Sequence, residues 1–96
     1  MIVRFNIDVA GQDQYDYRVT YEGEDLYADT GLGSIEACVT AALEGLGGDA
    51  VAAEVAFKGV ISGTYGLASL ALASNHIAQH ALQTTEAIEE ALQNAD

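Results

Sequence analysis

The sequence has no proline, one cysteine and three basic side chains against fifteen acidic ones. The single cysteine, Cys38, excludes an intramolecular disulfide and fits a reducing compartment. The shortage of lysine and arginine gives a formal net charge of −12, spread over the whole chain rather than held in a tail. A field of this sign repels nucleic acid and attracts basic surfaces, so the composition excludes direct nucleic-acid binding.

Residues 59–85 contain no Asp, Glu, Lys or Arg, which raises the question of a membrane span. Polar residues interrupt the stretch too often for a lipid-facing helix; they are Ser62, Thr64, Ser69, Asn75, His76, Gln79, His80 and Gln83. The first residues, MIVRFNID, lack a basic start followed by an apolar run, so we expect no signal peptide. We therefore expect a cytoplasmic protein that does not contact membranes.

Alternation of apolar and polar side chains predicts two strands, at residues 2–9 and 15–21, separated by the polar loop AGQDQ. The segment EGED at residues 22–25 predicts a turn into a third strand. The N-terminal third is therefore expected to form a three-stranded antiparallel meander.

The register of the third strand decides which of its side chains face solvent. If residues 22–25 close a hairpin, Tyr21 faces Leu26 and Val19 faces Ala28. Tyr27 and the neighbouring Asp29 then point outward, because successive side chains of a strand alternate between its faces.

Helical spacing begins at Ser34, a good N-cap, and Gly47-Gly48 is a good stop signal. Alternation over residues 51–58 favours a fourth strand, although the alanines there also tolerate a helix. The glycine-containing segment GVISGTYG, residues 59–66, is expected to be a connector.

Helical spacing returns at Leu67 and continues to residue 95. It predicts either one long helix or two helices divided at Gln83-Thr84-Thr85, with Thr85 as the cap of the second, and no proline is present to decide between them. The whole pattern predicts a single α+β domain over residues 1–96, with a small antiparallel sheet covered on one face by two or three helices.

The stretch LYADTGLGSIEA, residues 26–37, contains two motifs that are typical of enzymes. Asp29-Thr30-Gly31 resembles the catalytic triplet of retroviral-type aspartic proteases, but that family is nearly all strand and the resemblance ends at the triplet. Gly31 and Gly33 before a helix suggest a phosphate loop, but neither a Walker lysine nor a third glycine at Rossmann spacing is present. A strand end, a turn and an N-cap account for the stretch.

Other side chains offer little catalytic chemistry. His76 and His80 are four residues apart on a predicted helix and could share a metal ion, but no third ligand is evident. Cys38 flanks the apolar face of the first helix and is expected to act as a small hydrophobe. We therefore expect no enzyme, no catalytic residue, no metal and no cofactor.

The acidic side chains remain as the candidate site, on the outward face and loops of the sheet and on one turn of the last helix. A solubilising surface or adaptation to salt also produces such acids, although surfaces normally mix both signs of charge. The candidate partner-binding residues are Asp16, Glu22, Glu24, Asp25, Tyr27, Asp29, Glu86, Glu89 and Glu90.

These residues suggest an inhibitor. Carboxylates on a rigid surface compete for the Lys and Arg side chains that bind phosphates, and an outward Tyr27 adds an aromatic anchor. In size and charge the chain is similar to small phage inhibitors of host defence, the anti-CRISPR proteins among them, and to nuclease immunity proteins. That similarity lies in composition and in no particular residue. It implies a nucleic-acid mimic that binds a basic protein or a nucleoprotein complex.

The alternative hypothesis is a homo-oligomeric interaction or chaperone-like module. The uncharged segment 59–85 contains small residues that permit close packing, and a long helix with a narrow apolar stripe often pairs with another helix. Leu70 and Ile77 on that stripe are the candidate residues for a homodimer contact.

Overall fold

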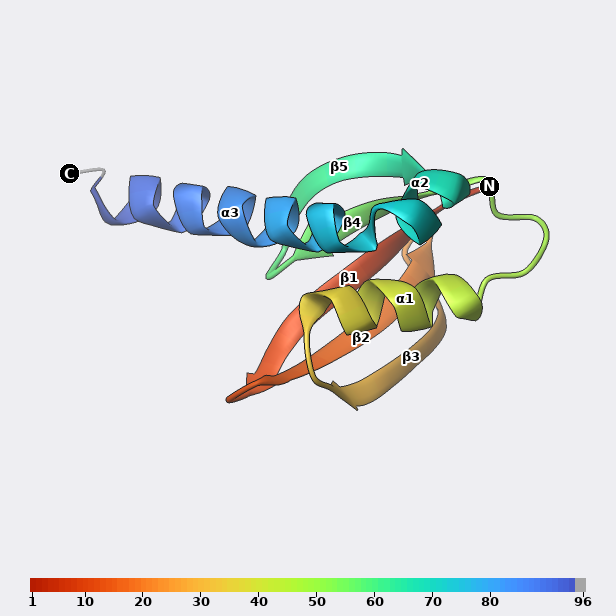
Figure 1. The fold of residues 1–96 in the computed structure, drawn as a ribbon, viewed down its shortest axis with the longest axis horizontal. Helices are drawn as coiled ribbons and strands as arrows, with labels where there is room; N and C mark the ends of the chain where they lie inside the picture. The colour runs from red at the N-terminus through yellow and green to blue at the C-terminus, as the bar shows by residue number, and fades with distance from the viewer. Residues whose placement is uncertain (95–96) are drawn as a thin grey trace.

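The computed structural model describes residues 1–94, which form a five-stranded mixed sheet with three helices packed on it (Figure 1). The order in the sheet is β3-β2-β1-β4-β5, and its strands are β1 (Ile2–Gly11), β2 (Gln14–Tyr21), β3 (Glu24–Leu32), β4 (Ala52–Phe57) and β5 (Val60–Gly66). The helices are α1 (Ile35–Glu44), α2 (Leu67–Leu72) and α3 (Ser74–Gln93). The α+β class, the meander β1–β2–β3 and the fourth strand are confirmed.

The core lies between the sheet and the helices. On β1, Val3, Phe5 and Ile7 are buried under the helices, whereas Arg4 and Asp8 lie on the uncovered face. This is the alternation that the sequence predicted. Helix α1 begins as expected, because the Ser34 side chain accepts a hydrogen bond from the backbone N–H of Ala37 at 3.0 Å.

The sheet is not purely antiparallel, because β4 pairs with β1 in parallel register from Ile2↔Ala52 to Ile7↔Phe57. Helix α1 connects β3 to β4 along the chain and lies on the covered face of the sheet (Figure 1). It returns the chain to the end of the sheet at which β1 starts, and β4 therefore runs in the same direction as β1. The central strand β1 thus has one antiparallel and one parallel neighbour.

The prediction of a connector over residues 59–66 is wrong, because Val60–Gly66 forms strand β5. Lys58 and Gly59 have φ angles of 53° and 82° and make the turn of a β4–β5 hairpin. Two-residue turns with positive φ at both positions match the twist of the strands that they join. The glycines of β5 suggested a loop, but its Val, Ile, Thr and Tyr residues are good strand formers.

The division of the C-terminal helical segment lies at Ala73, not at the predicted Gln83-Thr84-Thr85. Helix α3 continues through Thr85, which is buried and does not act as a cap. Its Oγ1 instead donates a hydrogen bond to the backbone oxygen of Phe57 at 3.0 Å and so holds α3 against the end of β4.

Leu70 and Ile77, proposed above as self-association residues, are 0% and 4% exposed. Both side chains belong to the core, because the apolar stripe of α2 and the first half of α3 faces the sheet and α1. The folded chain therefore does not present them to a second copy. Within residues 1–94, none of the helices combines the length and apolar content needed to cross a bilayer.

Candidate binding surface

Every basic side chain of the protein is engaged in an ion pair. Arg4 lies 3.3 Å from a carboxylate oxygen of Glu54, Arg18 lies 3.2 Å from Asp25, and Lys58 lies 2.9 Å from Glu89. Fourteen of the fifteen acidic residues fall in the described range, so eleven of them have no cationic partner there. Most of the negative charge of residues 1–94 is therefore not paired with a cation of the same chain.

The predicted acidic residues do not form one cluster. Glu22, Glu24 and Asp25 lie at the β2–β3 turn, whereas Asp16 and Asp29 lie near the opposite end of these strands. Asp16 and Glu22 are six positions apart along an extended strand, a distance of about 20 Å.

Glu86, Glu89 and Glu90 lie on the second half of α3. The Lys58–Glu89 pair places this segment beside the β4–β5 turn, and the Lys58 amide bonds to the Ile7 oxygen of β1 at 2.9 Å. This is the end of the sheet that also carries Asp8 and Asp16.

Tyr27 and Asp29 do not lie on the uncovered face of the sheet as the sequence predicted, although Asp29 is exposed. Strand β3 has a bulge, because Val19 pairs with Tyr27 while the next residue, Thr20, pairs with Asp25 and leaves Leu26 as the extra residue. The extra residue shifts the pairing of β3 by one position. Side chains after Leu26 therefore lie on the opposite face of the sheet from the predicted one. Asp29 consequently lies opposite Tyr17, on the side of the sheet that the helices cover.

Tyr27 therefore belongs to the packing of the domain. Its hydroxyl donates a hydrogen bond to the backbone oxygen of Ala42 in α1, and its ring meets that of Tyr17 edge-on, with 6.3 Å between ring centres. A Cβ on Gly45 would lie 2.7 Å from the Tyr27 ring, so the absence of a side chain there lets the ring dock. A glycine directly after the helix was the one signal in the sequence for this contact.

A second bulge explains the Asp29-Thr30-Gly31 triplet. Tyr15 pairs with Leu32 and Tyr17 with Asp29, so Thr30 and Gly31 oppose a single residue of β2. Gly31 has a φ of 76° there, and its N–H donates to Asp16 Oδ1 at 3.3 Å. The triplet lies inside β3 and shapes the strand before the turn into α1.

Two carboxylates on the uncovered face lie side by side, an arrangement that the sequence did not predict. Asp8 of β1 and Asp16 of β2 are direct cross-strand partners. Like charges placed opposite each other destabilise a sheet, and no cation among residues 1–94 pairs with either of them. β1 extends to Gly11 and turns tightly, and the bulge between Val9 and Gly11 compensates for the shorter turn and sets Asp8 opposite Asp16.

Replacing Asp8 with asparagine is expected to raise the free energy of unfolding by about 0.2–1 kcal/mol, because it removes the repulsion between the two carboxylates. Asp16→Asn is the matched variant, and the gain of the double variant is expected to be less than the sum of the two single gains. Urea denaturation measures all three. Additive gains would show that Asp8 and Asp16 do not interact.

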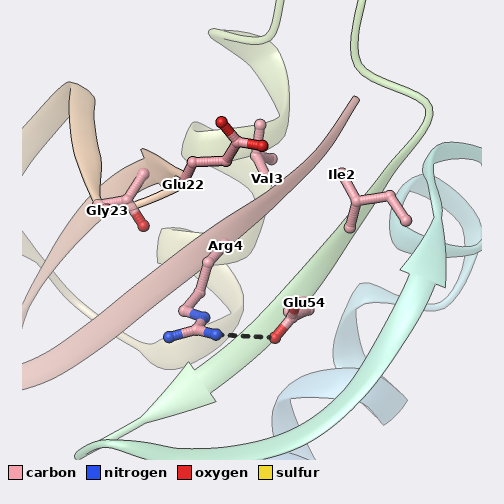
Figure 2. A pocket seen from close by; sticks show the side chains of 7 residues that line it. Ile2, Val3, Arg4, Glu22, Gly23 and Glu54 are labelled. Atoms are coloured by element: carbon pink, nitrogen blue, oxygen red, sulfur yellow. Dashed lines mark hydrogen bonds and ion pairs between the residues drawn. The ribbon is translucent and has the colours of Figure 1, made fainter.

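A hollow of about 280 Å³ lies on the uncovered face, beside the β2–β3 turn. Arg4 and Glu54 form one part of its wall as an ion pair, and the Glu22 carboxylate lies apart from that pair (Figure 2). Glu22 and Gly23 have φ angles of 51° and 84°, so a tight turn fixes the position of Glu22. The lining of the hollow thus contains two carboxylates and one guanidinium.

Cys38 is buried in α1. Burial first, and then the carboxylates of Asp16 and Asp29, raise the pKa of its thiol from 9.0 to about 11. Because the thiolate is the reactive form, we expect folded protein at pH 8 to react with a thiol reagent about 100-fold more slowly than unfolded protein. Labelling at equal rates would contradict the burial of Cys38.

The same shift makes stability depend on pH. The folded state holds the Cys38 proton more tightly than the unfolded state, so this contribution is complete below pH 9 and is lost as pH rises through 11. Chemical denaturation at a series of pH values measures the loss, and Cys38→Ala is expected to flatten that part of the profile.

Within residues 1–94, the fold brings no third metal-ligating side chain to His76 and His80. No group of three His, Cys, Asp or Glu side chains within residues 1–94 is placed to hold a metal ion. His80 Nε2 lies 3.5 Å from the hydroxyl of Thr84, on the same helix.

No protein-family model, curated protein or solved structure matches this chain.

Proposed function

We propose that this protein is an acidic inhibitor that occupies a basic, nucleic-acid-binding surface of a protein or nucleoprotein complex. The observation that supports the proposal is that all three basic side chains are already paired while eleven described carboxylates are not. Such a surface gives a strong negative field that steers association with a basic partner. The similarity in size and charge to anti-CRISPR proteins extends the proposal to a phage or mobile-element counter-defence role.

The hollow beside Glu22 gives the proposal a specific contact. A lysine or arginine of the target that enters the hollow would meet the carboxylate of Glu54 and that of Glu22, which has no cationic partner among residues 1–94. Carboxylates pair with guanidinium in the two-point geometry that phosphates also use. Nucleic acid and this protein would then compete for the same side chains, since Lys and Arg contacts to phosphate dominate nucleic-acid affinity.

The first experiment is capture of targets from a lysate of the native host on immobilised protein, at low salt and at ~0.5 M salt, where screening weakens exposed charge pairs. The captured protein is then purified and loaded with labelled duplex DNA. We expect this protein to displace the DNA at low salt and to lose that ability at high salt. Simultaneous binding of DNA and this protein to the target would contradict the proposal.

A pair of matched variants locates the contact. Glu22→Gln is expected to weaken binding to the purified target about ten-fold, the scale of one charged hydrogen bond. Glu44→Gln removes the same charge from the exposed end of α1 and is expected to change binding less than two-fold, about the effect of a distant charge. Equal effects would show that net charge acts without a specific contact.

Self-association through strand β5 is a second candidate. β5 is an edge of the sheet, and its seven residues carry no charge. An unprotected edge can pair with the same edge of another copy. Sedimentation equilibrium tests this: a dimer that Ile61→Lys dissociates would support self-association, and a monomer at high concentration would exclude it.

A further inference from the structure

Helix α3 carries both histidines of the protein, His76 and His80, near its start. At 100° per residue their side chains lie about 40° apart around the helix axis, so the two rings share one face. That face lies about 100–140° from the direction of Ala81, which is fully buried, and both histidines are exposed. The fold therefore leaves this pair of rings open to solvent.

The spacing of the two rings suits a metal ion. Residues four positions apart on a helix are neighbours, with about 5–6 Å between their Cβ atoms, and two histidines at this spacing bind zinc on the helix of zinc metalloproteases. Helix α3 is continuous from Ser74 to Gln93, so the folded chain keeps the spacing. The contact of His80 Nε2 with the Thr84 hydroxyl, at 3.5 Å, is longer than a normal hydrogen bond and leaves the ring free to turn toward His76.

The charges around the pair do not oppose a cation. Helices α2 and α3 contain no lysine or arginine. Lys58 is the basic side chain that reaches α3, and it meets Glu89, which lies beyond His80 by about 14 Å along the helix axis. The net charge of −12 also raises the concentration of cations near the surface.

The ligand count decides what kind of site the pair can make. No metal was expected from the sequence because a third ligand was lacking, and no group of three His, Cys, Asp or Glu side chains within residues 1–94 is placed to hold an ion. Structural zinc sites use four protein ligands, whereas sites with fewer keep water in the remaining positions. The positive end of the helix dipole at the start of α3 also disfavours a tightly held cation. Two imidazoles therefore make an open, exchangeable site.

We propose that His76 and His80 together bind one divalent transition-metal ion of the zinc, copper and nickel class, with water in the remaining positions. Imidazole nitrogen suits these ions, whereas Mg²⁺ and Ca²⁺ prefer oxygen ligands. The site goes beyond the proposed function and does not depend on it, because it uses neither the hollow beside Glu22 nor the unpaired carboxylates.

Titration with Zn²⁺, followed by the NMR signals of the imidazole rings, tests the proposal, because the protein has two histidines and both belong to the site. Both rings are expected to shift together and to saturate at one ion per chain, while Mg²⁺ at the same concentration shifts neither. A shift of one ring without the other would overturn the proposal. So would shifts confined to carboxylate-bearing residues, or saturation at two chains per ion.

Variants that move one histidine test the spacing itself. His76→Gln is expected to weaken Zn²⁺ binding at least about ten-fold, because one imidazole alone then holds the ion. Combining His76→Gln with Gln79→His leaves two histidines side by side in the sequence, about 100° apart around the helix, and is expected to bind as weakly as the single variant. Combining His76→Gln with Gln83→His spaces them three residues apart, on one face again, and is expected to restore binding.

The two double variants have the same composition, and both glutamines are exposed, so the folded state is expected to tolerate either change. Equal affinity of the two double variants for Zn²⁺ would show that spacing is irrelevant and would overturn the proposal. DNA displacement from the purified target is expected to be the same for His76→Gln as for the unaltered protein, so failure of this site and failure of the proposed function are separate results.

Discussion

Leu70→Ala is expected to lower the free energy of unfolding by about 2–5 kcal/mol, the range for leucine truncated in a closed core. Leu70 is 0% exposed and lies in the same core cluster as Val39, Val55 and Ile77. A cavity there opens between α2, α1 and the sheet, which relax only partly around a truncated side chain. Urea denaturation followed by circular dichroism measures the change.

Leu72→Ala is the matched control, since it makes the same change two residues along α2 at a side chain that is 89% exposed. Its effect is expected to stay within about 0.5 kcal/mol. Equal losses for the two variants would mean that α2 packs through a different face. A variant of Leu70 that unfolds the chain also cannot serve as a test of self-association.

Tyr27→Ala is expected to destabilise the protein by about 3 kcal/mol, since it removes a ring that packs against Tyr17 and over Gly45. The side chain is half-buried, so the loss falls below that of a fully enclosed aromatic residue. Thermal and urea unfolding measure it. A stable Tyr27→Ala variant that only fails to bind a partner would restore Tyr27 as an outward anchor.

Tyr27→Phe separates the hydroxyl from the ring. It keeps the packing and removes the hydrogen bond to the Ala42 oxygen, so a loss of about 1 kcal/mol is expected. Burial, and then Tyr17, raise the pKa of Tyr27 from 10.0 to about 12. The Tyr27 contribution is therefore lost as pH rises from 10 through 12, and Tyr27→Phe is expected to lack that loss.

The elements that follow a simple period could be predicted from the sequence. β1 alternates strictly, and α1 has a good cap in Ser34, so both are where the pattern placed them. β5 was missed because three glycines in residues 59–66 outweighed its strand formers. The division at Ala73 was missed because alanine is a strong helix former and gives no stop signal.

The candidate site depended on register, which local pattern does not determine. One extra residue at Leu26 turned Tyr27 inward, and a bulge between Val9 and Gly11 set Asp8 opposite Asp16. The ion pairs of Arg4 and Lys58 join residues 50 and 31 positions apart, respectively. No spacing rule connects such distant positions, so the sequence showed the excess of acid but not its arrangement.

The parallel pairing of β1 with β4 also sets the order in which this chain can fold. The partners of β2, β3 and α1 include elements within residues 2–44, but the other edge of β1 stays open until residues 52–57 arrive. Closing that loop is slow compared with forming a hairpin, because the paired residues are far apart along the chain. During synthesis, the N-terminal half therefore exposes an apolar strand edge of the kind that chaperones bind and aggregates grow from. Electrostatic repulsion between the many acidic side chains of that half would oppose the association of such incomplete chains.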